Sequence, residues 1–172
     1  YFSSAASLNS SSGASAGMVI YDGKDAMESE GVAASLRMLD GRKHKRVLSL
    51  SSPSVTEQGI HLDYLDGSRA QYALWCEKCT EFKVPQWPDS ANRPHPHTFM
   101  CPDFDHPLDK TKGEWIHAKP EEVHKSYTIS HFASPTVHPI EMLNEWDLIR
   151  DDPKKVASFY NYRLGVPCNA KE

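Results

Sequence analysis

The chain has 172 residues, 23 of them acidic and 19 basic, which gives a formal net charge of −4. This length allows one α/β domain with a small addition but excludes two full domains, and the net charge excludes a bulk electrostatic attraction to nucleic acid, so a DNA partner would need a local basic surface. No apolar run approaches the roughly 18 residues of a membrane helix, and the N-terminal stretch lacks the pattern of a signal peptide. We therefore expect a soluble, cytoplasmic protein with no membrane partner.

The first predicted elements alternate between strand and helix. The Ser- and Ala-rich residues 1–16 are typical of a flexible linker or of a tight loop packed under a sheet. The run "GMVIYD" then predicts a buried parallel strand with Asp22 at its carboxyl end, and "EGVAASLRMLD" predicts a helix that ends at Gly41. The run "VLSLSSPS" predicts a second buried strand. A strand, a helix and a strand form a parallel crossover, so we expect the two strands to be neighbours with their ends together.

Candidate nucleotide-binding groups follow these two strands. An acid after an apolar strand is where ATPases hold Mg²⁺, and hydroxyls such as those of Ser51 and Ser52 can sense a phosphate or a bound water. The alternatives are structural, because Asp-Gly is a common turn dipeptide and serines often cap turns. The sequence contains no GxxxxGK[ST] phosphate loop, so this stretch alone is not expected to bind ATP strongly.

A dense positive run lies just before the second strand. It consists of Arg42, Lys43, Lys45 and Arg46. Side chains of this kind can contact DNA phosphates, although such a run is more commonly a solvated loop.

The central region has the spacing of a zinc ribbon. Cys76 and Cys79 form one C-x2-C knuckle, and Cys101 opens a second, "CPDFDH", in which Phe104 stands where the second thiolate is expected. Strands predicted for "AQYALW" and "GEWIHA" would flank these knuckles as a small β-ribbon. Clustered cysteines with nearby histidines favour a metal site in a reducing compartment over a disulfide framework.

The fourth zinc ligand is open at this point. His106 is the nearest donor that could replace the missing cysteine, and His95 and His97 lie on the approach to the second knuckle. Three thiolates and one imidazole make a standard structural zinc set. The alternative is that Phe104 fills the metal cavity with apolar bulk and no metal binds.

The C-terminal part predicts one strand and two helices. The strand is "SYTISHF"; the helices begin at Pro139 and at Asp152-Pro153, and the second ends at Gly165.

Taken in order, these motifs resemble the large terminase subunit of tailed phages, in its lambda-like branch. The resemblance covers nearly the whole chain and rests on the order of "GASAGMVIYDGKDAMES", "LSLSSPSVTEQGI", "GSRAQYALWCEKC", "CPDFDH", "GEWI", "YTISHFASP" and "FYNYRLGVP". It implies an α/β fold: the second half of a P-loop ATPase core with a parallel sheet over residues 1–72, a zinc-ribbon-like insert over 73–118, and a strand with C-terminal helices leading toward a nuclease domain over 119–172.

The resemblance also implies a function. Asp22 matches the Walker B acid that associates with the Mg²⁺ of Mg-ATP in the intact protein, and Ser51 and Ser52 match the motif that couples nucleotide state to DNA movement. Gly23 replaces the glutamate that positions the attacking water, a kind of role worth about 10²–10⁴-fold in rate. Because the phosphate loop is also missing, we expect this segment to be inactive alone. The implied partners are double-stranded DNA, the small terminase subunit and the portal of the procapsid, in the cytoplasm of a bacterial host.

Two other functions remain open. One is a non-enzymatic zinc-ribbon module that binds nucleic acid or protein. The other, with less support, is a metal-dependent hydrolase that uses the His-rich insert.

Overall fold

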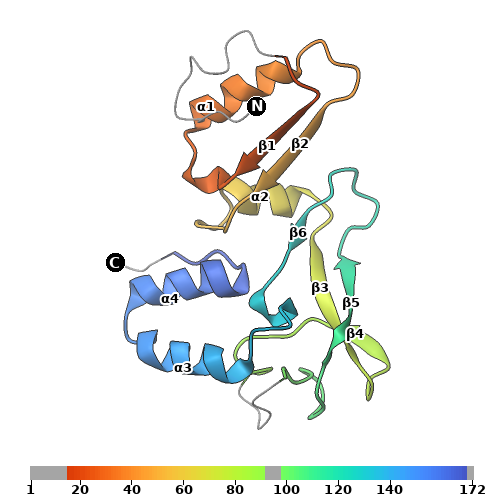
Figure 1. Ribbon diagram of the computed structural model, residues 1–172, viewed down its shortest axis with the longest axis vertical. Coiled ribbons are helices and arrows are strands. Elements are labelled where there is room, and N and C mark those ends of the chain that lie inside the picture. Colours follow the sequence, from red (N-terminus) through yellow and green to blue (C-terminus); the bar gives the residue numbers. More distant parts are fainter. Residues whose placement is uncertain (1–14, 92–97, 170–172) are drawn as a thin grey trace. The chain divides into compact units, whose positions relative to one another are not determined.

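The chain folds into two compact units, Tyr1–Ser52 and Pro53–Glu172, in a computed structural model that describes residues 15–91 and 98–169. Both units mix helices and strands, so the predicted α/β class is confirmed in its coarse form (Figure 1). The segment boundaries expected at residues 72 and 118 both fall within the second unit. Most of the Ser/Ala-rich stretch, residues 1–14, lies outside the described residues, as do His95 and His97.

The first unit is a parallel strand pair with a helical connection. β1 (Met18–Asp22) and β2 (Arg46–Leu50) pair in parallel with Met18 opposite Arg46 and Asp22 opposite Leu50. Between them run the short 3-10 helix η1 (Lys24–Ala26), α1 (Ser29–Leu36) and a final 3-10 turn, η2 (Arg37–Leu39). The two strands are therefore parallel neighbours with their carboxyl ends together, as the sequence predicted.

The prediction that both strands are buried is wrong for the described residues. Tyr21 and Leu39 are buried, and the Tyr21 hydroxyl lies 2.7 Å from Ser35 Oγ, which ties β1 to α1. Parallel sheets normally have both faces covered, whereas among the described residues of this unit α1 is the one α-helix beside the pair, with the short η1 and η2 at its ends. The apolar side chains left exposed are those of Met18, Ile20, Val47, Leu48 and Leu50.

The second unit is built around the central strand β3 (Ala70–Cys76). β4 (Glu81–Lys83) and β5 (Asp109–His117) pair with it antiparallel on opposite sides, and β6 (Tyr127–Thr128) pairs with it in parallel. The predicted β-ribbon is thus present. β6 is shorter than the predicted strand "SYTISHF", because the chain turns into a 3-10 helix, η3 (His131–Ala133).

A buried serine lies at the place where the chain enters and leaves the ribbon. Ser68, which is fully buried, accepts a hydrogen bond from the backbone N–H of Ser126 and lies 2.9 Å from His117 Nδ1. Two residues later, Ala70 pairs with His117 at the ends of β3 and β5. The chain therefore leaves the ribbon next to the point at which it entered.

The helices of the second unit follow their start and stop signals, with one addition. α3 (Pro139–Ile149) and α4 (Pro153–Phe159) begin at the predicted prolines, and the Asp152 side chain accepts hydrogen bonds from the first backbone N–H groups of α4. A π-helical turn, η4 (Tyr160–Leu164), ends at Gly165, whose φ of 66° suits glycine. The addition is α2 (Gly59–Asp66), which precedes β3 and was not predicted.

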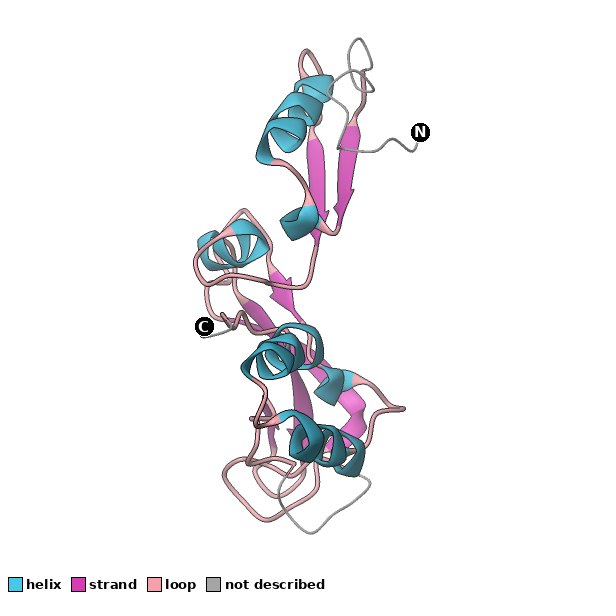
Figure 2. Ribbon diagram, turned by 90° about the vertical axis from the view of Figure 1, so that its left-hand side faces the viewer, coloured by secondary structure: helices cyan, strands magenta, loops and turns pink. Residues whose placement is uncertain are grey.

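The core of this unit joins the ribbon to the C-terminal helices. Figure 2 shows the helices in cyan and the strands in magenta. Buried side chains from β3, the second knuckle, η3, α3, α4 and η4 form one cluster: Leu74, Cys76, Ala91, Phe99, Cys101, Leu108, Phe132, Met142, Phe159 and Leu164. Two of the cysteines are therefore core residues. Among the described residues, no helix has the length and apolar character needed to cross a membrane.

Candidate functional sites

The carboxyl ends of β1 and β2 form the first candidate site. Asp22 is exposed and lies opposite Leu50, whose carbonyl accepts a hydrogen bond of 2.8 Å from the backbone N–H of Gly23. The backbone N–H of Asp25 donates to Ser51 Oγ over 3.1 Å. The structure thus brings the turn after Asp22 and the hydroxyl after β2 to one edge of the sheet, with Ser52 exposed beside them.

The polar side chains that follow the two strands are one carboxylate, Asp22, and two hydroxyls, Ser51 and Ser52. Carboxylates and hydroxyls at the carboxyl ends of adjacent parallel strands are where α/β folds hold magnesium or phosphate. Ser51 Oγ also lies 3.2 Å from the carbonyl of Ser52, to which it donates. The Ser51 hydroxyl therefore links the turn after β1 to the turn after β2, which is the structural role that serines have at strand ends.

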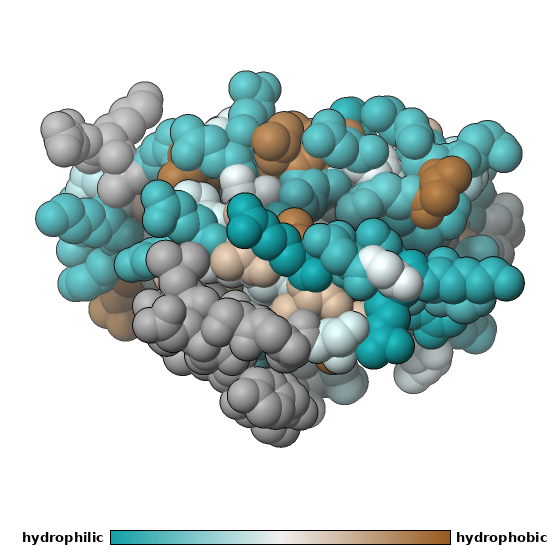
Figure 3. All heavy atoms as spheres, turned by 90° about the horizontal axis from the view of Figure 1, so that it is seen from above, coloured by the Kyte–Doolittle hydropathy of each residue, from teal (hydrophilic) through white to brown (hydrophobic). Residues whose placement is uncertain are grey.

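The basic run forms an exposed edge of the first unit. Arg42, Lys43 and Lys45 lie in the loop before β2, and Arg46 is the first residue of that strand. Lys45 Nζ is 3.6 Å from Asp40, and both side chains are mostly exposed, so this pair holds the lysine only weakly. The face drawn in Figure 3 is mostly hydrophilic, with apolar side chains in small separate areas.

The second candidate site is a cluster of three thiols. The Sγ atoms of Cys76, Cys79 and Cys101 all lie within 4.8 Å of one another, and those of Cys79 and Cys101 are 3.5 Å apart. Thiolates around a tetrahedral zinc ion, with Zn–S bonds of about 2.3 Å, lie about 3.8 Å from one another. The spacing therefore fits one metal ion held by three sulfurs.

Local structure explains how the three thiols meet. Cys76 ends β3, and the turn that follows is closed by a hydrogen bond of 2.9 Å from Thr80 N–H to the Cys76 carbonyl, which folds Cys79 back toward it. Cys101 comes from the second knuckle, where an isolated bridge pairs Met100 with Pro107. Cys76 and Cys101 are fully buried, and Cys79 is partly exposed.

The thiols differ in acidity. Burial raises the pKa of the Cys76 thiol, but hydrogen bonds from the backbone N–H groups of Cys79 and Lys78 and from the neighbouring thiols outweigh burial, so this pKa lies below its ordinary value. Burial, hydrogen bonding and the charges of the other two sulfurs raise the pKa of Cys79 to about 12. Cys76 therefore loses its proton more easily than an ordinary thiol, and the charge of its thiolate opposes ionisation of Cys79, an opposition that a bound cation would remove.

Lys83, which the sequence analysis did not single out, joins β4 to the second knuckle. Lys83 Nζ on β4 lies 2.8 Å from Glu81 and 2.9 Å from Asp103 of the second knuckle. Hydrogen bonds to Glu81 and then to Asp103 raise the pKa of Lys83. Its signal in the sequence is an alternating "EFK" strand that places Glu81 and Lys83 on one face.

The structure does not bring His106 to the three thiols. Among the described residues, the only group of three or more potential metal ligands is Cys76, Cys79 and Cys101. His106 Nδ1 instead lies 3.0 Å from the carbonyl of Pro107. The His106 carbonyl accepts a hydrogen bond from Cys101 N–H over 2.9 Å, so a tight turn places the backbone of His106, and not its ring, against the third cysteine.

Phe104 lies partly at the surface. Its side chain is 44% exposed, and Lys78 Nζ lies 5.0 Å from the centroid of its ring. The ring is not part of the buried cluster that contains Cys76 and Cys101.

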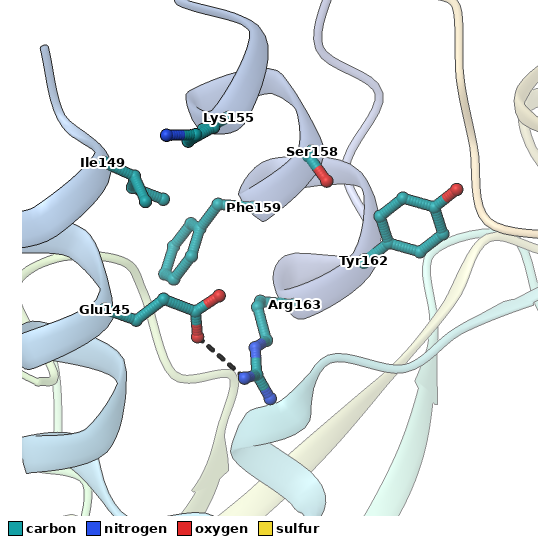
Figure 4. A pocket seen from close by; sticks show the side chains of 7 residues that line it. All are labelled: Glu145, Ile149, Lys155, Ser158, Phe159, Tyr162 and Arg163. Carbon is teal, nitrogen blue, oxygen red and sulfur yellow. Dashed lines mark ion pairs between the residues drawn. The ribbon is translucent and has the colours of Figure 1, made fainter. Parts of the chain in front are cut away.

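A small hollow lies between α3 and the C-terminal helical segment (Figure 4). Its volume is about 270 Å³, and its lining includes Glu145, Lys155 and Arg163. Arg163 pairs with Glu145 over 2.7 Å, and Lys155 lies 3.4 Å from Asp152. Because these cations are already paired within the protein, the hollow is not assigned a ligand.

Comparison with known proteins identifies no relative. No family model matches the sequence, and no curated protein or solved structure is significantly similar to it.

Proposed function

We propose that this chain is part of the large terminase subunit of a tailed phage, the motor that couples ATP hydrolysis to movement of double-stranded DNA into the procapsid. The observation that carries the proposal is the parallel pairing of β1 and β2, which puts Asp22 opposite Leu50 and sets Ser51 against the turn after Asp22. This is the arrangement expected of a Walker B strand beside a coupling strand. The motif order of the sequence supports the same assignment.

In this function each group has a defined role. Asp22 associates with the Mg²⁺ of Mg-ATP, and Ser51 and Ser52 respond to the state of the nucleotide. The phosphate loop must come from residues outside this sequence, so the chain by itself is not expected to bind Mg-ATP. The small terminase subunit and the procapsid portal are the proposed partners, in the cytoplasm of the bacterial host.

A chimaeric motor tests this function. The chain replaces the equivalent segment of a lambda-like large subunit, once as it stands and once with Gly23→Glu, and DNA-stimulated ATP hydrolysis and packaging are measured. We expect the Gly23→Glu chimaera to hydrolyse ATP about 10²–10⁴-fold faster than the Gly23 chimaera and to lose that activity with Asp22→Asn. Two folded chimaeras that bind the small subunit but neither hydrolyse ATP nor package DNA would contradict the proposal.

The cysteine cluster supports a second candidate, a zinc-binding module. Cys76, Cys79 and Cys101 would bind one structural zinc ion, and the ribbon around it would contact nucleic acid or protein without enzymatic activity. Metal analysis of the purified chain should find one zinc per chain, lost in Cys76→Ser and kept in the control Cys168→Ser. A metal-free wild-type chain after purification with zinc present would contradict it.

DNA binding by the basic run separates the two candidates. The module function predicts binding of duplex DNA by the isolated chain that is lost when Arg42, Lys43, Lys45 and Arg46 are replaced by glutamine. About four phosphate contacts would give a slope of log K against log salt of roughly −3.6. The motor function requires no such binding by the isolated chain.

A further inference from the structure

We propose that the metal ion in the cysteine cluster keeps its fourth coordination position for an exchangeable neutral donor, water in the isolated chain and an imidazole nitrogen when one is supplied. The inference rests on the zinc site proposed above and names the ligand that completes it. It makes the ribbon a contact point for a donor from outside the cluster, such as a histidine of a partner protein.

The burial of the three cysteines indicates the side from which a fourth ligand would reach the metal. Cys76 and Cys101 are fully buried in the core, whereas Cys79 is partly exposed. A metal ion bonded to all three sulfurs is therefore enclosed by protein on the side of Cys76 and Cys101. The accessible side is that of Cys79, where the chain approaches solvent.

The residue at the fourth knuckle position is not a metal ligand. In a C-x2-C knuckle the second ligand stands three positions after the first, which in "CPDF" is Phe104. Its ring lies beside Lys78 Nζ, at 5.0 Å, and is 44% exposed. A phenyl ring has no donor atom for zinc, so this knuckle supplies one thiolate, that of Cys101.

His106 is held by its own turn. Its Nδ1 lies 3.0 Å from the Pro107 carbonyl, and its backbone is bonded to Cys101 N–H and to the Phe104 carbonyl. Among the described residues, His106 does not join the three thiols as a fourth potential ligand.

The fourth donor sets the charge of the site. Three thiolates and a divalent ion carry a net charge of −1, and a fourth thiolate held by the second knuckle would bring it to −2, the charge of a standard four-thiolate zinc site. The ammonium group of Lys78 is the nearby positive charge, and Asp103 of the same knuckle is already paired with Lys83. Water or imidazole adds no charge, and both are ordinary ligands of zinc.

Cobalt substitution of the full chain tests the proposal. Co²⁺ loaded in place of zinc reports its ligands through its visible d–d bands, and the thiolate-to-cobalt absorption reports that the metal stays bound. We expect the d–d bands of the wild-type chain to shift with added imidazole along a saturable one-site curve while the thiolate band is retained. His106→Ala should give the same curve and change cobalt affinity by less than about tenfold, the lower limit for loss of a supporting partner.

Phe104→Cys is the matched control, because its thiolate should fill the fourth coordination position of the metal. A fourth thiolate should convert the cobalt spectrum to that of an all-thiolate site, and added imidazole should then cause no shift. A wild-type spectrum that is insensitive to imidazole, or one that becomes sensitive only in His106→Ala or in His95→Ala/His97→Ala, overturns the inference because a histidine of the chain then fills the corner. Failure of the wild-type chain to bind either metal contradicts the zinc site itself, a result separate from the response to imidazole.

Discussion

Lys78 and Phe104, which come from the two knuckles of the cysteine cluster, contact each other, with Lys78 Nζ 5.0 Å from the centroid of the Phe104 ring. A cation over an exposed ring contributes about 0.5–1 kcal/mol. The two knuckles are therefore joined at the surface by this pair as well as in the interior by the thiols.

Phe104→Cys should raise the affinity for zinc by at least about tenfold, because a thiolate replaces a weaker ligand in a position where a C-x2-C knuckle already points. Competition with a chromophoric chelator measures the change. Phe104→Ala is the control and should leave the affinity nearly unchanged, since it removes only the contact with Lys78. Equal affinities for the Cys and wild-type forms would show that the fourth corner is elsewhere.

Phe99→Ala should destabilise the second unit by about 3–5 kcal/mol, the usual loss for a buried phenylalanine. Phe99 is fully buried and its ring packs 4.6 Å from that of Phe132. Urea unfolding followed by tryptophan fluorescence measures the change. The half-exposed Phe104 provides the comparison: its replacement by alanine should cost no more than about 1 kcal/mol.

Gly23→Ala should destabilise the first unit by about 1–2 kcal/mol, because Gly23 has a φ of 76° and a ψ of 42°, a left-handed conformation that costs an L-residue this much. No atom lies within 4 Å of a Cβ placed there, so the cost comes from the backbone and not from a clash. Thermal unfolding by circular dichroism measures it. Gly23→Asn should cost less, since asparagine tolerates this region, and a larger loss for asparagine than for alanine would contradict the explanation.

Stability should fall as the pH is lowered from about 6.5, the ordinary pKa of histidine. Burial, and then the charge of Arg163, lower the pKa of His131, against the opposite effect of Glu145. Arg163 Nη1 donates to His131 Nδ1 over 2.9 Å, which requires a neutral ring. The unfolded chain therefore binds a proton before the folded chain does, and stability is lost from the unfolded pKa down to the folded one.

Urea midpoints at pH 7.5 and pH 5.5 measure this dependence. His131→Gln should make the difference between the two midpoints smaller, because the group that takes up the proton is gone. An unchanged difference would assign the pH dependence to other histidines.

The elements with explicit start and stop signals were predictable from the sequence. α3 and α4 begin at prolines, α4 is capped by Asp152, and Gly165 ends the last turn in the left-handed conformation that such a glycine indicates. The parallel pairing of β1 with β2 followed from the strand, helix and strand order. These features depend on local chemistry, which a sequence records directly.

Features that depend on neighbours were not predictable. The apolar runs of β1 and β2 indicated burial on both faces, but burial is a property of what packs against a strand, and Ile20 is 58% exposed. α2 has neither a capping side chain nor a strongly one-sided apolar pattern, so few of its residues indicate a helix. Spacing identified the three cysteines that the structure brings together, but the orientation of His106 is set by its hydrogen bonds to Cys101 and Phe104 and by the contact with Pro107.

The ribbon and the C-terminal helices share a single core, in which Cys76 and Cys101 pack in the same cluster as Met142 and Phe159. Although the ribbon begins and ends at adjacent residues, Ala70 and His117, it is not a detachable appendage, since its removal would strip α3 and α4 of their apolar contacts. Recombination between related genes would therefore have to exchange both segments as one block to yield a chain that folds.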